Sequence, residues 1–246
     1  MVVLDPVVIA LLALAIGMYT RAVVIVRRRG RSVPWWQITL FGLGMACEAI
    51  ALLGPPDALG HKLMLSHMSQ HLLLADIGAP LIVAGIRSPV LLFLLPKPIL
   101  MPLARRKGLR TVFRYLRKPT VAIPIYIIVL YGWHAPQLFE AALRNNFIHV
   151  LQHESFFIAG VLVWWSVLEP KKFRVPGQLW KGAHIAGVRL SGMFLGMFFI
   201  ISSSAAYSGF YGNSSEQYGI SPLQDTRIAG GLMFGVDFFI VLGSLA

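Results

Sequence analysis

The stretch DPVVIALLALAIGMYTRAVVIVRRRGR, residues 5–31, decides the fold class. Its apolar run is long enough to cross a hydrocarbon core about 30 Å thick, which takes roughly 20 helical residues. Four arginines then stand between positions 27 and 31. A secretory signal carries its positive charge before the apolar run, so we predict a retained first membrane helix. The whole chain has this character, because 57% of its 246 residues are hydrophobic and only 13% are charged, which excludes an ordinary soluble domain.

Apolar stretches of similar length recur along the chain. They predict an all-α, polytopic membrane protein with seven transmembrane helices, at about 5–26, 35–54, 62–86, 120–134, 148–168, 184–207 and 224–245. Residues 135–146 are expected to form a short helix outside the membrane, with Asn145 or Asn146 capping the next span. No stretch of these residues is expected to form a soluble domain, so residues 1–246 are predicted to form a single transmembrane helical domain.

Basic residues are concentrated in alternate loops. Clusters follow the first, third and fifth stretches, and nine Lys and Arg lie between Arg87 and Lys118. The positive-inside rule therefore predicts an N-terminus outside and a C-terminus in the cytoplasm. Most of the net charge of +12 comes from the loops that set the orientation in the membrane, so no nucleic-acid partner is expected. The segment at about 87–118 is predicted to lie at the cytoplasmic interface of the lipid bilayer, against anionic lipid.

Six of the seven histidines fall on the predicted outer side. His67 and His71 are four residues apart, as are His149 and His153, so each pair presents both imidazoles on one helical face. Desolvating imidazoles at one depth is unfavourable unless they are paired or ligated. We therefore predict a metal site whose candidate ligands are His67, His71, His134, His149, His153, Met64 and Met68. His61 and His184 are expected to play structural roles.

The ligand types narrow the choice of metal. Met64 and Met68 place thioethers beside the imidazoles of their own helix. The single cysteine, Cys47, excludes a thiolate zinc site or a disulfide within the chain. Imidazole with thioether suits copper better than magnesium, calcium or manganese, whereas zinc and iron are not excluded by ligand type.

Several charged residues fall inside predicted spans. Arg189 is expected to pair with Asp237 or with Asp76, in preference to a role in proton or ion passage. Glu48 is a further acid in the second span. Two acids close in depth to the histidines are candidates to orient imidazoles as hydrogen-bond acceptors, Glu154 and Asp225.

Three motifs resemble one known family. HMSQHLLL (67–74), GWHAP (132–136) with FEAALRNNFIHVLQHESFFIAG (139–160), and DTRIAGGLMF (225–234) are similar to the CtaG family of seven-helix membrane proteins, which are associated with assembly of haem–copper cytochrome c oxidases. The chain departs from the family pattern at Thr226 and Phe234, which concerns the last span more than the histidines. An unrelated single-span copper chaperone with cysteine ligands shares the family's name, and this chain cannot be that protein.

The resemblance implies a non-enzymatic factor in the plasma membrane of a bacterium, where it helps to mature the copper centre of the oxidase on the outer face. Its partners there would be cytochrome c oxidase subunits or copper chaperones. The matching positions carry the metal-site expectation over to His67, Met68, His71, His134, His149 and His153.

Two other functions stay open at this point. A haem-binding electron-transfer subunit would use two histidines on different helices as axial ligands, with Gly78 and Gly160 leaving room for the macrocycle. An intramembrane metallohydrolase would use Glu154 as the base beside a metal-activated water. The sequence HVLQHES lacks the HExxH motif, since Gln152 stands between the two histidines.

Overall fold

The computed structural model describes residues 5–168 and 178–245, and every regular element in these ranges is a helix. Five helices are long: α1 (Pro6–Arg28), α2 (Trp35–Leu53), α11 (Asn146–Leu168), α12 (Gln178–Ile201) and α14 (Pro222–Leu245). The third span is composed of α4 (Met64–His71), a π-helix η1 (Leu72–Gly78) and α5 (Ala79–Gly85). The remaining elements are α3 (Pro55–Gly60), α6 (Leu91–Leu94), α7 (Lys97–Arg105), α8 (Lys107–Leu116), α9 (Pro119–Trp133), α10 (Pro136–Arg144), α13 (Ser208–Tyr211) and η2 (Ser214–Tyr218).

The polytopic architecture predicted from the sequence is confirmed. Six helices in the described ranges have the length and apolar character to cross a membrane, and α9 with α10 forms a seventh candidate bent by 72°. Asn145 caps α11 as predicted, because its side-chain oxygen accepts hydrogen bonds from the backbone N–H groups of Phe147 and Ile148 at 3.0 and 3.2 Å. The orientation of the bundle across the membrane stays a prediction.

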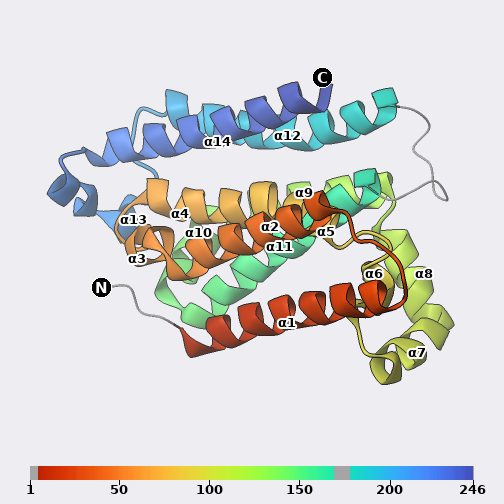
Figure 1. The fold of residues 1–246 in the computed structure, drawn as a ribbon. Helices are drawn as coiled ribbons and strands as arrows, with labels where there is room; N and C mark the ends of the chain where they lie inside the picture. The colour runs from red at the N-terminus through yellow and green to blue at the C-terminus, as the bar shows by residue number, and fades with distance from the viewer. Residues whose placement is uncertain (1–4, 169–177, 246) are drawn as a thin grey trace.

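The helices run side by side along one direction (Figure 1). α12 and α14 lie along each other on one side, α1 lies on the opposite side, and α2, α4, α9 and α11 lie between them. α12 and α14 approach closely where Gly196 meets Gly230, since a Cβ on either glycine would come within 2.7 Å of the other's carbonyl oxygen. The start of α1 and the end of α14 lie at opposite ends of the bundle (Figure 1).

The sixth span differs from its predicted bounds of 184–207. α12 ends at Ile201, because a run of serines follows and the Ser202 hydroxyl donates a hydrogen bond to the Ser204 carbonyl at 2.8 Å. Serine side chains that bond nearby backbone groups compete with helix continuation in this way. Tyr207 then adopts a left-handed conformation with φ of 52°, so the chain turns away from the helix axis.

The π-helix η1 interrupts the third span. Pro80 lies within the first turn of α5 and lacks the N–H that would pair with the Asp76 carbonyl in a regular α-helix. The chain forms a wider turn instead, in which the Ala79 N–H donates to the Leu74 carbonyl five residues back. Asp76 lies within this wider turn.

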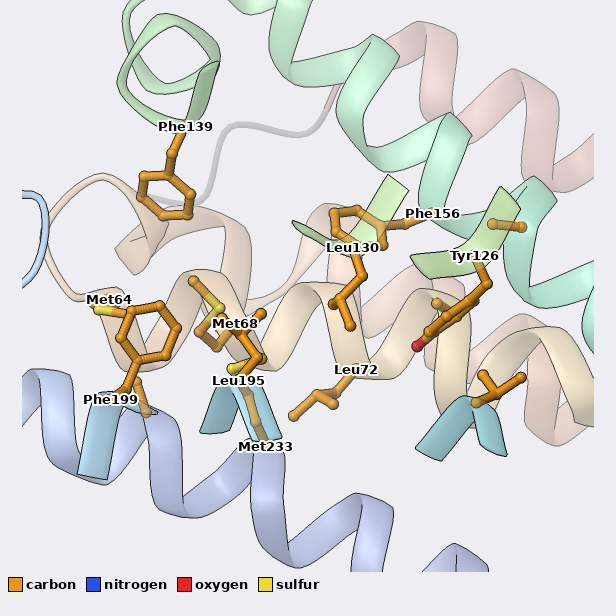
Figure 2. Close-up of a cluster of buried hydrophobic side chains, with 14 of the residues drawn as sticks. Met64, Met68, Leu72, Tyr126, Leu130, Phe139, Phe156, Leu195, Phe199 and Met233 are labelled. Atoms are coloured by element: carbon orange, nitrogen blue, oxygen red, sulfur yellow. The ribbon is translucent and has the colours of Figure 1, made fainter. Parts of the chain in front are cut away.

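The buried core joins the middle helices to the α12–α14 pair. Figure 2 shows side chains of this core that come from the middle helices and from the α12–α14 pair. Fourteen are drawn there, and those labelled are Met64, Met68, Leu72, Tyr126, Leu130, Phe139, Phe156, Leu195, Phe199 and Met233. A second apolar cluster attaches α1 to α2, where the rings of Tyr19 and Phe41 stack 3.7 Å apart.

The basic segment at about 87–118 folds as the short helices α6, α7 and α8. None of the residues of α7 or α8 is buried, as expected of helices that cover a surface rather than a core. Both lie at the end of the bundle away from α3 and α10 (Figure 1). Their contact with cytoplasmic lipid stays a prediction.

Candidate metal site

The first histidine pair is positioned by α4. The carboxylate of Asp225, on α14, accepts hydrogen bonds from the backbone N–H groups of Met64 and Leu65 at 2.7 and 3.0 Å. A carboxylate at a helix N-terminus satisfies free N–H groups and opposes the helix dipole. Asp225 therefore fixes where α4 begins, and this replaces the predicted role of orienting an imidazole. His67 and His71 follow on one face of α4, with 0% and 5% of their surface exposed.

The second pair comes from α11. His149 and His153 are each 7% exposed, and their ring centroids lie 4.1 Å apart. The two pairs face each other across the helix interface, since the ring of His67 lies 5.3 Å from that of His149 and the ring of His71 lies 5.4 Å from that of His153. The four-residue spacing thus predicted correctly that each pair shares a face, and the fold brings the two faces together.

Three of these imidazoles are close enough to share one ion. One nitrogen from each of His67, His149 and His153 lies within 4.8 Å of the other two. Nitrogen ligands bind an ion at about 2 Å, so two of them can be separated by at most about 4 Å across it. Side-chain rotations of less than about 1 Å would bring these nitrogens into first-shell range.

Unpaired nitrogen atoms show that the cluster fits a metal. Among the described residues, neither ring nitrogen of His67 or His71 has a hydrogen-bond partner, and Nε2 of His149 and of His153 also lacks one. Buried polar atoms are nearly always hydrogen-bonded, and leaving one unpaired costs about 1–3 kcal/mol. These six nitrogens belong to four rings, each of which can give one nitrogen to a single ion, so their lack of partners is compatible with a metal site.

His134 extends the cluster toward the thioether sulfur of Met68, which is a soft ligand. Its Nδ1–H donates to the Leu130 carbonyl at 2.7 Å, which leaves the lone pair on Nε2. That Nε2 lies 3.4 Å from the Met68 sulfur, and the His134 ring is 6.1 Å from the ring of His71. Met68, His71 and His134 thus form a thioether–imidazole group next to the three-histidine group.

The comparisons with known proteins identify the family. The family model for "Cytochrome c oxidase caa3 assembly factor (Caa3_CtaG)" matches residues 17–246, which is most of the chain. The chain belongs to this family. The resemblance found in the three sequence motifs is therefore confirmed, and the protein is a Caa3_CtaG member whose family assembles cytochrome c oxidase. Neither curated proteins nor solved structures gave a match.

The other candidate residues of this Caa3_CtaG protein lie in different settings. Met64 is buried at 1% exposure in the apolar core, and no imidazole in the described ranges donates a hydrogen bond to its sulfur. His61 is exposed, and its ring centroid lies 5.6 Å from that of His149, at the edge of the cluster. His184 is remote and donates from Nε2 to the Val163 carbonyl at 3.2 Å, which agrees with its predicted structural role.

Two buried glutamines were missed in the sequence analysis. Gln70 and Gln152 are both 0% exposed. Gln70 donates from its amide to the Ala51 carbonyl and the Asp57 carboxylate, both at 3.0 Å, and so ties α4 to α2 and α3. Neither polar atom of the Gln152 amide has a partner among the described residues. The signal was available, because Gln152 stands three residues after His149 and so shares its face of α11.

The glycines proposed to make room for haem are used for helix packing. A Cβ on Gly160 would lie 2.6 Å from the Ala75 carbonyl oxygen, and a Cβ on Gly78 would lie 2.5 Å from the Glu48 carboxylate. Both spaces are therefore filled by neighbouring helices of this Caa3_CtaG protein. The geometry gives no support to a macrocycle between the two histidine pairs.

The metallohydrolase alternative gains no support either. Glu154 is exposed and lies in the wall of an apolar cavity of about 260 Å³ between α1, α2, the third span and α11. Glu48 lies in the same wall. His153 lines this cavity as well. A general base must reach the proton that it abstracts within about 3 Å, and no hydrogen bond joins Glu154 to an imidazole in the described ranges.

Proposed function

We propose that this chain is a non-enzymatic membrane factor that takes up copper at the outer face of the bacterial plasma membrane and hands it on during cytochrome c oxidase assembly. Family membership supports the assembly role. The six unpaired buried imidazole nitrogens support the metal, and they are the single observation that carries the proposal. Copper here is cargo that the protein passes to oxidase subunits or to a copper chaperone.

The arrangement of ligands supports copper over harder ions. His67, His149 and His153 supply a three-nitrogen group, and Met68 with His134 adds a thioether 3.4 Å from an imidazole nitrogen. Magnesium and calcium prefer carboxylate and carbonyl oxygens, and neither the three-histidine group nor the thioether–imidazole group includes such an oxygen among the described residues. Thioether and imidazole together favour Cu(I). The His67 and His71 rings, 4.4 Å apart, connect the two groups, so an ion could be exchanged between them ligand by ligand.

The loop between α12 and α14 covers the outer end of this site. The Tyr207 hydroxyl donates to the His134 carbonyl at 2.8 Å, and the Tyr211 hydroxyl donates to the Gly60 carbonyl at 2.9 Å. Burial raises the pKa of the Tyr207 hydroxyl, so it remains a donor at neutral pH. A partner that displaces this loop would gain access beside His61, the exposed imidazole at the edge of the cluster.

The orientation is part of the proposal. α3 and α10 lie at the same end of the bundle as the start of α4, and the basic helices α7 and α8 lie at the other end (Figure 1). The positive-inside rule then puts the histidines near the outer surface. A cysteine introduced in place of the exposed Asn146, in a Cys47→Ser background, should react with an impermeant thiol reagent added outside intact cells. Labelling only after the membrane is opened would reverse the orientation.

Copper analysis of the detergent-purified protein tests the function. We expect stoichiometric copper in the wild type and loss of most of it in the His67→Ala/His71→Ala double variant. His184→Ala is the matched control, because it removes a buried histidine that bonds only a helix carbonyl. Full copper content in the double variant, or equal loss in His184→Ala, would remove the third span from the site.

A growth test separates copper supply from scaffolding. In a strain that lacks the protein, added copper should restore oxidase activity if the chain supplies the metal. Activity that stays absent at every copper concentration would indicate that the chain holds oxidase components together instead.

A further inference from the structure

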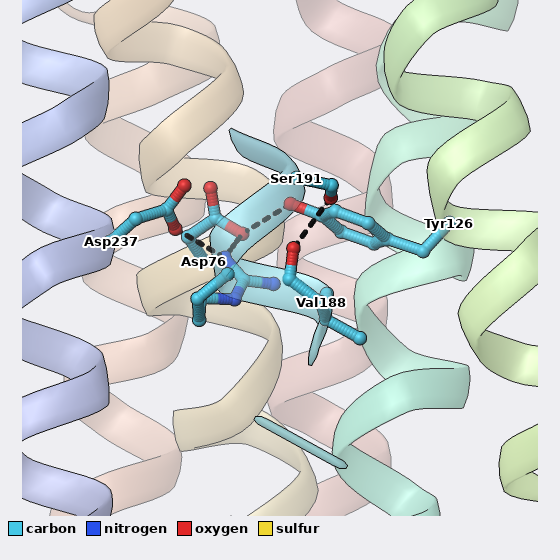
Figure 3. A network of polar contacts seen from close by, with 6 residues as sticks. Asp76, Tyr126, Val188, Ser191 and Asp237 are labelled. Carbon is cyan, nitrogen blue, oxygen red and sulfur yellow. Dashed lines mark hydrogen bonds and ion pairs between the residues drawn. The ribbon is translucent and has the colours of Figure 1, made fainter. Parts of the chain in front are cut away.

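Three charged side chains meet in the middle of the bundle, below the histidine cluster. Figure 3 shows the carboxyl groups of Asp76 from η1 and Asp237 from α14 next to each other, and both contact the guanidinium of Arg189 from α12. Nη1 of Arg189 donates to Oδ1 of Asp76 and, at 3.0 Å, to Oδ1 of Asp237. The Tyr126 hydroxyl also donates to Oδ1 of Asp76, at 2.9 Å. The charged residues are 6%, 1% and 2% exposed for Asp76, Arg189 and Asp237.

The charges in this group do not balance. Two carboxyl groups face one guanidinium, so full ionisation would leave one net negative charge in the middle of the membrane. An isolated charge there is strongly unfavourable. The other titratable groups nearby are Tyr126 on α9, which is a neutral donor, and the imidazoles of His71 and His134 across a small cavity. Further along α12, His184 is engaged with the Val163 carbonyl, and α11 contributes Phe156 to the cavity.

The cavity connects this group to the histidine cluster. Its volume is about 20 Å³, and it is lined by Met68, His71 and His134 toward the metal site and by Asp76 and Asp237 on the other side. A site needs about 10–15 Å³ and two or more polar partners to hold one water molecule, and both conditions are met.

A contact at Gly192 places one carboxyl oxygen of Asp237 at the cavity. Gly192 lines it, and a Cβ at that position would overlap Oδ2 of Asp237, so this oxygen lies at the cavity wall. The hydrogen bond that Asp237 accepts from Arg189 is at the other oxygen, Oδ1. The cavity wall thus offers the carboxyl oxygens of Asp76 and Asp237 and the imidazoles of His71 and His134 to a water molecule.

We propose that Asp76, Arg189 and Asp237 form a proton-binding site, which holds one proton at neutral pH and exchanges it through the water-sized cavity below His71 and His134. The proton makes the group electrically neutral, because one carboxylate then pairs with the guanidinium and the other is a carboxylic acid. In the exchange, the carboxyl O–H bond breaks as the cavity water accepts the proton. The hydronium formed then returns a different proton to the carboxylate, so the site exchanges its proton with the cavity water and the group stays neutral.

Infrared spectroscopy of the metal-free protein tests the site. We expect the C=O stretch of a protonated carboxyl at neutral pH, shifted in deuterated water. Either Asp76→Asn or Asp237→Asn should remove that band, because the single remaining carboxylate then matches Arg189 and needs no proton. Glu48→Gln is the control, since any band from that buried acid disappears only in this variant. Absence of the band from the wild type, or its survival in both Asn variants, would overturn the site.

The rate of deuterium uptake into the same band tests the route. Leu72→Phe places a larger side chain in the cavity wall and should slow uptake at least about tenfold. Leu162→Phe enlarges a buried leucine of α11 outside the cavity lining and should leave the rate unchanged. Equal rates in Leu72→Phe and the wild type would exclude this cavity as the path. Neither measurement depends on whether copper binds, so the outcome is independent of the proposed function.

Discussion

Gly160→Ala is expected to weaken copper binding without removing any ligand. Gly160 lies where α11 contacts η1, and a Cβ there would come within 2.6 Å of the Ala75 carbonyl oxygen and 3.1 Å of the Ala75 Cα. Both atoms belong to the backbone, so no side chain can rotate to make room. The two helices must separate.

The size of the displacement follows from the contact. Ordinary contact with a Cβ begins at 3.4 Å, so 3.4 minus 2.6 gives a separation of about 0.8 Å. His153 is seven residues before Gly160, about 10 Å along the same helix, and it faces His67 and His71 on the other segment. Metal–ligand distances tolerate about 0.2 Å. A shift of this size should raise the Kd for copper by about 10- to 100-fold, as changes outside the ligand set commonly do.

The assay is competition with a chromogenic Cu(I) chelator on the detergent-purified protein, together with thermal unfolding. Gly231→Ala is the matched control, because a Cβ at Gly231 on α14 meets nothing within 4 Å. That variant should bind copper normally and unfold at a slightly higher temperature, since alanine favours a helix by about 1 kcal/mol over glycine. Copper affinity in folded Gly160→Ala equal to that of Gly231→Ala would refute the reasoning.

Three further outcomes are expected. Arg189→Met should lower the free energy of unfolding by about 3–5 kcal/mol, because it leaves Asp76 and Asp237 without their cation. Chemical denaturation measures this loss. Adding Asp76→Asn and Asp237→Asn to the same variant should restore part of it. Asp225→Ala should cost about 1 kcal/mol through loss of the α4 cap, and an unchanged melting temperature would deny that role. Bound copper should stay in place between about pH 7 and 5 and be released only on stronger acidification, because protons compete for imidazole nitrogens but burial disfavours the charged imidazolium; release that is complete by about pH 5 would contradict ligation by buried imidazoles.

Much of the fold was predictable because membrane spans depend on local composition. The length of each apolar stretch predicted where the helices lie, and the four-residue spacing of His67 with His71 predicted a shared face. Pairing between helices was open, since Arg189 had either Asp76 or Asp237 as its predicted partner. The structure shows that it contacts both, because three different segments converge there.

The remaining features depend on contacts between distant segments. The role of Asp225 required knowing that α14 begins beside α4, which no periodicity indicates. The packing role of Gly160 depended on the approach of η1, and the end of α12 depended on side-chain bonds made by Ser202. Sequence spacing also could not separate Met68 from Met64, since only the fold decides which sulfur meets the His134 ring.

The π-helical turn Leu72–Gly78 also bears on how this family diverges. A π turn accommodates one more residue than an α turn while the flanking helices keep their faces. Relatives one residue shorter at this place should therefore retain both the histidine pair before it and the packing of α5 after it. They would differ in which side chain occupies the position of Asp76. Insertion or deletion of one residue here would thus keep the histidine pair of α4 and change the side chain at the position of Asp76.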